Sequence, residues 1–160
     1  MNIIFLTLID INDINERGIY QDLLRKFRNE GHKVFIISPV ERRKKCKSEL
    51  KVQDGIFLLK VRTLNIQKTN MIEKGVGTLL LENQYLTGFR KRFSNIKFDL
   101  VLYSTPPITF AKIIQYIKKR DKAKSYLLLK DIFPQNAVDL RILRRNGFLH
   151  KFFCSKEKQL

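Results

Sequence analysis

The stretch that decides the fold runs from residue 98 to residue 136 and reads FDLVLYSTPPITFAKIIQYIKKRDKAKSYLLLKDIFPQN. Apolar runs at Leu100–Tyr103 and Ser125–Leu129 predict two buried strands. Between them, residues 106–120 predict a helix. Its apolar residues recur at helical spacing on one face: Phe110, Ile113, Ile114 and Ile117. A strand, a helix and a second strand in this order predict a parallel βαβ unit.

The same alternation continues on both sides of this stretch. Additional strands are expected at residues 3–9, 34–37 and 56–61, the second of them ended by Ser38 and Pro39. Additional helices are expected from Ile19 to a stop at Gly31, and at residues 71–93, 135–145 and 147–160. Residues 41–51 predict a basic loop. The chain is therefore expected to be one α/β domain over residues 1–160, Rossmann-like and doubly wound, with a mostly parallel sheet and helices on both faces.

Charge is the outlying feature of the composition. Lys and Arg total 32 against 15 acidic residues, a formal net charge of +17. Such a charge favours polyanions, namely nucleic acid, anionic lipid head groups or phosphorylated substrates, although a solvated lysine-rich surface accounts for it equally. Two distant cysteines and two histidines argue against a disulfide framework and against a metal site. No apolar run reaches the roughly 20 residues that cross a bilayer.

Functional residues are expected at the strand-to-helix junctions, because open α/β sheets bind ligands at the carboxyl ends of their strands. The first junction, residues 12–20, offers Gly18 for close approach of backbone to a ligand and Arg17 for a phosphate. A plain connecting loop is the equal alternative. The segment lacks GxGxxG, which disfavours a nicotinamide oxidoreductase.

Two later junctions carry clustered polar residues. Ser104 and Thr105 precede two prolines, so they cap a helix or present hydroxyls at a cleft. The next strand ends in Lys130 and Asp131, followed by an aromatic residue, a proline and two amides. A carboxylate at this edge is costly unless it is paired or used, so Asp131 caps the next helix, pairs with Lys130 or has a functional role. The dense cluster of polar side chains favours the functional role.

Four stretches together resemble family 4 glycosyltransferases, especially the branch that builds capsule and lipopolysaccharide O-antigen chains. They are residues 18–25 with Glu30–Val34, residues 61–70, residues 98–110 and residues 129–140. The last is similar to the family's D-[LI]-[WF]-P-[EQ] motif. The chain departs from many members in having no Gly-Gly pair in its first loop.

The resemblance implies a two-domain (GT-B) enzyme that transfers a sugar with retention, generally without a metal and with no cofactor. The N-terminal domain of such an enzyme receives the acceptor, often a polyprenyl-diphosphate-linked glycan. The C-terminal domain binds the nucleotide sugar through an E-x7-E pattern, and no such second domain is present in these residues. The chain is therefore expected to be a fragment that is inactive alone.

Carried over by resemblance, Asp131 is the candidate catalytic residue, close to the transferred sugar. The candidate substrate-binding residues are Arg17, Gly18, Tyr20, Ser104, Thr105, Lys130, Gln135 and Asn136.

A diphosphate lipid acceptor suits the charge, since anionic membranes attract basic residues. The chain is expected to be cytoplasmic and peripheral at the inner face of the cell membrane. The candidate contacts are Arg42, Arg43, Lys44, Lys45, Arg90, Lys91, Arg92 and Lys151. A non-catalytic membrane-docking subunit of a split transferase is the main alternative. A nucleic-acid-binding domain is disfavoured, because no reader motif is present and the basic residues are scattered.

Overall fold

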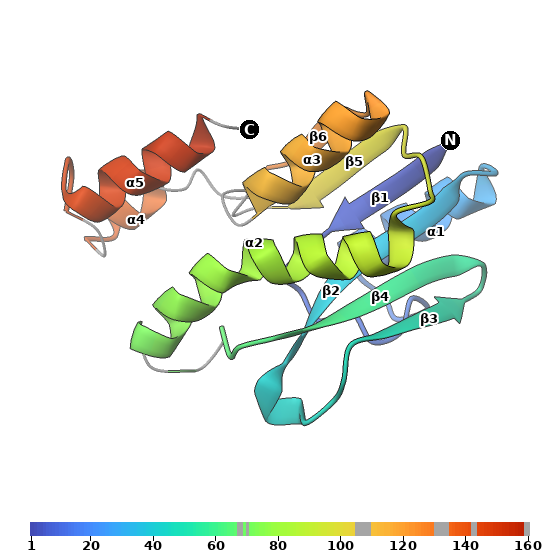
Figure 1. The fold of residues 1–160 in the computed structure, drawn as a ribbon, viewed down its shortest axis with the longest axis horizontal. Coiled ribbons are helices and arrows are strands. Elements are labelled where there is room, and N and C mark those ends of the chain that lie inside the picture. The colour runs from blue at the N-terminus through green and yellow to red at the C-terminus, as the bar shows by residue number, and fades with distance from the viewer. Residues whose placement is uncertain (67–68, 70, 105–109, 130–134, 142–143, 159–160) are drawn as a thin grey trace.

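The computed structural model describes residues 1–66, 69, 71–104, 110–129, 135–141 and 144–158 (Figure 1). Its strands are β1 (Asn2–Leu6), β2 (Lys33–Glu41), β3 (Glu49–Gln53), β4 (Ile56–Thr63), β5 (Leu100–Ser104) and β6 (Lys124–Leu128). Its helices are α1 (Ile19–Asn29), α2 (Met71–Phe93), α3 (Ala111–Asp121), α4 (Gln135–Asp139) and α5 (Phe148–Glu157), with a short 3-10 turn, η1 (Arg42–Lys44).

The strands form one six-stranded sheet in the order β3-β4-β2-β1-β5-β6. All neighbours are parallel except β3 and β4, which are antiparallel. The strand order runs outward from β1 in both directions, as in a doubly wound sheet. The predicted α/β, Rossmann-like class is therefore confirmed.

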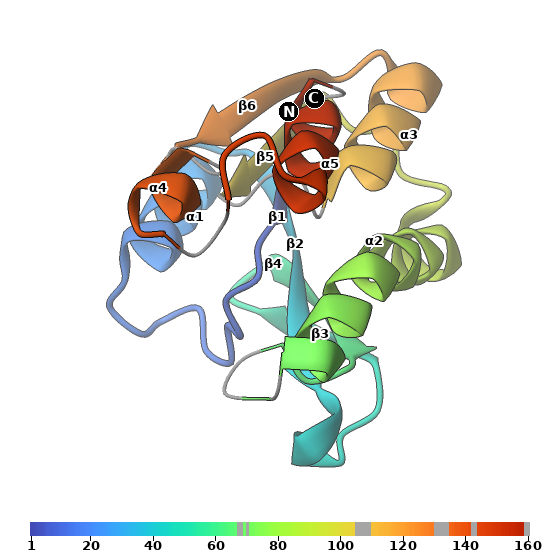
Figure 2. The ribbon, with the colours of Figure 1, turned by 90° about the vertical axis from the view of Figure 1, so that its left-hand side faces the viewer.

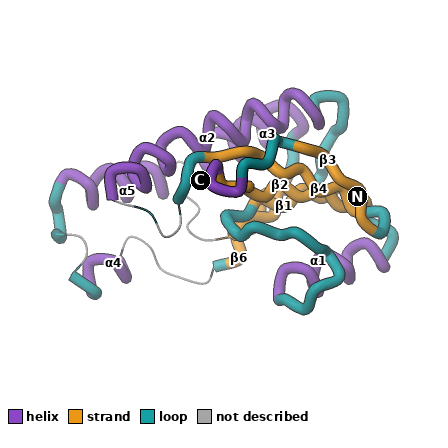
Figure 3. The backbone as a smooth tube through the Cα atoms, turned by 90° about the horizontal axis from the view of Figure 1, so that it is seen from below, coloured by secondary structure: helices purple, strands orange, loops and turns teal. Residues whose placement is uncertain are grey.

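Helices cover both faces of the sheet, as expected. Helices α2 and α3 lie on one face, which we call the α2/α3 face, and α1 lies on the other, the α1 face (Figures 2 and 3). The α2/α3 face is rich in aromatic rings: Phe35 stacks on Phe57 at 4.8 Å and meets Phe98 edge-on at 5.2 Å between ring centroids. The four residues that predicted α3, Phe110, Ile113, Ile114 and Ile117, are completely buried here.

Two expectations for residues 34–51 are wrong. Strand β2 does not stop at Ser38 and Pro39 but continues to Glu41, because β4 pairs with it beyond the last contact with β1. Proline is tolerated where a strand has a neighbour on only one side. Part of the expected loop is strand β3, which forms a hairpin with β4 through Asp54 and Gly55, both at positive φ. Asp-Gly is the residue pair that such a turn requires.

The ends of the helices follow the expected signals unevenly. Helix α1 ends before Gly31, which takes a φ of 80° and lets its N–H reach the carbonyl of Arg28. The helix expected at residues 135–145 is only the five-residue α4, and Arg141 already has positive φ.

Helices α4 and α5 lie beyond the carboxyl ends of the strands (Figures 1 and 3). Among the residues that the structure describes, no helix is long and apolar enough to cross a membrane.

Candidate functional site at the carboxyl edge of the sheet

A row of buried polar residues crosses the sheet at the carboxyl ends of its central strands. On the α1 face, the side chains of the central strands are apolar until the carboxyl ends of the strands, where they become polar. Ser38 of β2 pairs in register with Lys60 of β4. Leu6 of β1 pairs in register with Tyr103 of β5, and Thr7 and Ser104 are the residues that follow this pair. We call Lys60, Ser38, Thr7 and Ser104 the polar row. Each is at most 4% exposed, so each requires a partner.

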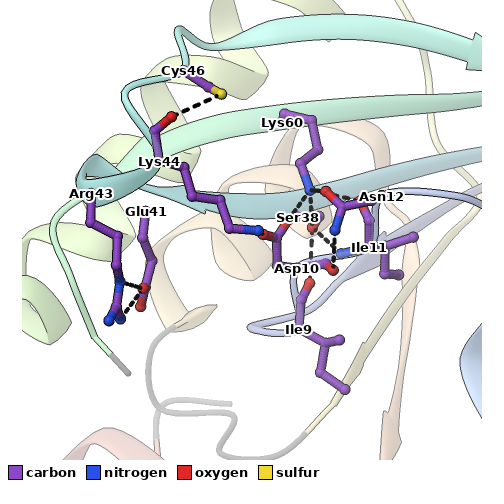
Figure 4. A network of polar contacts seen from close by, with 10 residues as sticks. All are labelled: Ile9, Asp10, Ile11, Asn12, Ser38, Glu41, Arg43, Lys44, Cys46 and Lys60. Carbon is purple, nitrogen blue, oxygen red and sulfur yellow. Dashed lines mark hydrogen bonds and ion pairs between the residues drawn. The ribbon is translucent and has the colours of Figure 1, made fainter. Parts of the chain in front are cut away.

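Lys60 is the centre of the contacts made by this row (Figure 4). Its Nζ pairs with the carboxylate of Asp10 and donates to the carbonyl oxygen of Ile11 at 2.6 Å. Weaker contacts reach Asn12 Oδ1 at 3.3 Å and Ser38 Oγ at 3.4 Å. Three of these partners belong to the first half of the β1–α1 loop (residues 7–18), and Ser38 belongs to β2. Their oxygen atoms compensate the buried charge of the Lys60 ammonium.

The ion pair shifts the pKa of both partners. Burial lowers the pKa of the Lys60 ammonium, and the hydrogen bond and charge of Asp10 only partly oppose this. For Asp10, burial raises the pKa, but hydrogen bonds from Lys44 and Lys60 outweigh burial and the net pKa is lowered. At neutral pH the carboxylate is therefore charged and held between two ammonium groups.

The remaining members of the row hold the chain directly after β1. Ser38 Oγ accepts from the N–H of Ile11 at 2.9 Å and donates to the carbonyl of Ile9 at 2.8 Å. Ser104 Oγ lies 3.5 Å from Thr7 Oγ1, and the hydroxyl of Tyr85 on α2 donates to the carbonyl of Thr7 at 2.7 Å. Burial raises the pKa of Tyr85 well above its ordinary value, so it acts as a neutral donor.

A hollow of about 630 Å³ opens beside this row, on the α1 face. The start of α1 and the last residues of β6 form its walls. The lining residues are Ile19, Tyr20, Leu23 and residues 126–129. Ile19 is 73% exposed and Tyr126 is 60% exposed, which leaves apolar surface available to a ligand.

Three of the predicted substrate residues lie at the start of α1. Arg17 is exposed, and Tyr20 lines the hollow while its ring packs on Phe5 at 5.0 Å. Gly18 is the N-cap of α1 and has extended backbone, with φ at 179°, so its conformation does not require glycine. A Cβ at this position would meet only the flexible side chain of Gln21.

The other predicted site residues are buried, hydrogen-bonded within α4 or outside the described residues. Ser104 is buried in the polar row, under the carboxyl edge of the sheet. Gln135 donates to Asp139 Oδ1 at 2.8 Å within α4. Thr105, Lys130 and Asp131 lie outside the described residues, as does the side chain of Asn136.

The predicted anion contacts lie on different parts of the molecule. Their positions are the turn after β2 (Arg42, Arg43, Lys44 and Lys45), the end of α2 (Arg90, Lys91 and Arg92) and α5 (Lys151). The first group is at the carboxyl edge of the sheet and the second is at the opposite edge (Figure 1). Arg42, Arg43 and Lys44 pair with Glu73, Glu41 and Asp10, respectively.

Sequence reasoning missed Asp10, Ser38 and Lys60. One signal was present for Lys60, because it interrupts the apolar run of β4 at a position that period two places on a buried face. Within the described part of the chain, no group of three or more His, Cys, Asp or Glu side chains could hold a metal ion.

No model of a known protein family matches this chain, and none of the curated proteins matches it in sequence.

Proposed function

We propose that this chain is the acceptor-binding domain of a retaining, two-domain glycosyltransferase that extends a lipid-linked glycan for a surface polysaccharide. The observation that carries the proposal is the hollow at the carboxyl edge of the parallel sheet, between the start of α1 and the end of β6. Ligands of open α/β sheets occupy this edge. The four stretches that resemble family 4 glycosyltransferases supply the reaction class.

The chemistry around the hollow suits a polyprenyl diphosphate. Gly18, the N-cap of α1, makes no capping hydrogen bond through a side chain, and the positive end of the helix dipole there suits the ligand's diphosphate. Arg17, which precedes this N-cap, is exposed, and an arginine side chain can bind two phosphate oxygens at once. The apolar wall of Ile19, Leu23 and Tyr126 matches the first isoprene units.

The remaining roles follow the same proposal. Asp131, with Lys130, Thr105 and the amides of Gln135 and Asn136, is assigned to the end of the acceptor at which the sugar is transferred. The nucleotide sugar is bound by a second domain, which these 160 residues do not include. The net charge of +17 favours docking at the anionic inner face of the cell membrane, where a lipid-linked acceptor resides.

Binding of geranylgeranyl diphosphate tests the acceptor assignment. Isothermal titration or fluorescence should detect binding to the wild-type chain that exceeds binding of inorganic diphosphate and of geranylgeraniol, because the site combines an anion site with an apolar wall. Arg17→Ala should weaken binding about tenfold, the loss expected for a charged hydrogen bond. The matched control is Arg92→Ala, an exposed arginine at the opposite edge of the sheet.

Two results would overturn the proposal. One is equal affinity for geranylgeranyl diphosphate in the Arg17 and Arg92 variants. The other is salt-dependent binding of duplex or single-stranded nucleic acid by a chain that does not bind the prenyl diphosphate. In a transfer assay, the chain alone should be inactive, and a donor-binding domain supplied in the same chain or separately should produce glycan transfer.

A further inference from the structure

The β1–α1 loop has no regular secondary structure, yet side chains from four elements hold its backbone. Ser38 of β2 and Lys60 of β4 bind the backbone of residues 9–11. Gln53 of β3 accepts from the N–H of Ile14 at 3.1 Å and donates to the carbonyl of Asn12 at 3.0 Å. Arg25 of α1 donates to the carbonyls of Ile14 and Glu16. The loop is therefore fixed from its start to the residue before Arg17.

Lys60 is the costliest of these anchors. A buried ammonium loses its hydration, and only the surrounding oxygen atoms compensate for the loss. A pair of apolar side chains in place of Lys60 and Asp10 would avoid this cost. A lysine here is therefore poorly explained by stability alone, since apolar replacements of buried ion pairs are often neutral or stabilising.

Lys60 fixes the path of the loop backbone. Its Nζ binds the Asp10 carboxylate, the Ile11 carbonyl and Asn12 Oδ1 in three successive residues of the loop. An apolar side chain would fill the same space without fixing the path of these residues. The side chains of Ile11 and Ile14 are each 1% exposed and pack in the apolar core of the α1 face, which holds the loop against the sheet.

We propose that Lys60 is a positioning residue for the acceptor site: it holds the β1–α1 loop in the single path that delivers Arg17, Gly18 and the start of α1 to the hollow. The role rests on the proposed acceptor function. Lys60 itself contacts no ligand, because it is buried beneath the loop. Its effect on acceptor binding passes through the backbone of residues 10–16.

Lys60→Met in the full chain tests the role by two measurements. Hydrogen exchange of the Ile11 and Ile14 amides should become at least about tenfold faster, while amides of β1 and β5 stay protected. Affinity for geranylgeranyl diphosphate should fall about tenfold. The urea midpoint of unfolding should fall as well, because the substitution removes one partner of a buried ion pair and leaves the Asp10 carboxylate to Lys44 alone. The matched control is Lys51→Met on β3, an exposed lysine whose partner is Glu49 at 2.9 Å.

Ser38→Ala provides a second variant if Lys60→Met folds poorly, since it removes two other anchors of the same loop. It should also accelerate exchange at Ile11 and weaken binding. Unchanged exchange of the loop amides in both variants would overturn the positioning role. So would a fall in stability with unchanged affinity, which is the signature of a purely structural lysine. Failure of the wild-type chain to bind the ligand refutes the acceptor assignment, and with it the positioning role; the exchange data then still report whether Lys60 fixes the loop.

Discussion

The two faces of the sheet are built from the same strands but are finished differently. The α2/α3 face is closed by two helices over a dense set of aromatic rings, in which Phe35, Phe89, Phe93 and Phe98 contact one another. The α1 face is closed by one helix and by an irregular loop held through polar contacts. Beside that loop lies the hollow lined by α1 and β6.

This difference separates stability from binding. Apolar burial is non-directional and is proportional to area, so the aromatic face stabilises the domain without specifying a ligand. The polar row on the α1 face contributes less net stability, because each hydrogen bond replaces one to water. Its contribution is to fix backbone at the edge where a ligand is expected. Truncation of the buried aromatic rings should therefore lower stability, whereas changes in the polar row and the hollow should mainly weaken binding.

The largest effect on stability is expected from Phe98→Ala on the α2/α3 face. Phe98 is fully buried and packs against Phe35, Phe89 and Phe93. Its truncation should lower the free energy of unfolding by about 3–5 kcal/mol, measured by urea denaturation. Tyr126→Ala, an exposed aromatic on the other face, is the control. A loss below about 1 kcal/mol for Phe98→Ala would refute the assignment of stability to this face.

An intermediate effect on stability is expected when the pH is lowered. Burial raises the pKa of Asp121, but hydrogen bonds from Arg120 and from the Phe98 N–H at 3.0 Å outweigh it, so the net pKa is lowered; Asp10 is lowered likewise. A lowered folded-state pKa stabilises the fold above the ordinary value of 3.8, and this stability is lost as pH falls through the folded-state pKa.

Asp121→Asn should therefore cost about 1–2 kcal/mol at pH 7 and flatten the decline of stability between about pH 5 and pH 2. Asp10→Asn should flatten the same decline and, unlike Asp121→Asn, should also accelerate exchange of the loop amides. Thermal unfolding across this range measures both. An unchanged acid slope in both variants would contradict the pKa directions.

The smallest effect on stability is expected in the hollow. Ile19→Ser and Tyr126→Ser change exposed side chains, so the free energy of unfolding should shift by no more than about 0.5 kcal/mol. Binding of geranylgeranyl diphosphate should nevertheless weaken. Leu24→Ala on the same helix is the matched contrast, because Leu24 is fully buried and its truncation should cost about 2–5 kcal/mol. Wild-type affinity in both serine variants would exclude the hollow as the prenyl site.

Much of the fold was predictable, because hydrophobic periodicity reports which residues are buried in strands and helices. The β3–β4 hairpin was missed although Asp54 and Gly55 carry its turn signal, since charged side chains nearby obscured the strand pattern. The candidate site was harder. The segment around Gly18 was correctly placed at the carboxyl edge, whereas Asp10 and Lys60 meet across a separation of 50 residues.

The sequence by itself determined the order of the helices and of every strand except β3, the parallel class of the sheet and the edge at which to look for a site. These follow from local patterns of apolar residues, which act within a few residues of one another. Only the tertiary structure decided that Lys60, Ser38, Thr7 and Ser104 form one row and that Lys60 meets Asp10 beneath the β1–α1 loop. Those contacts depend on strand register, and register is set by the packing of the whole sheet.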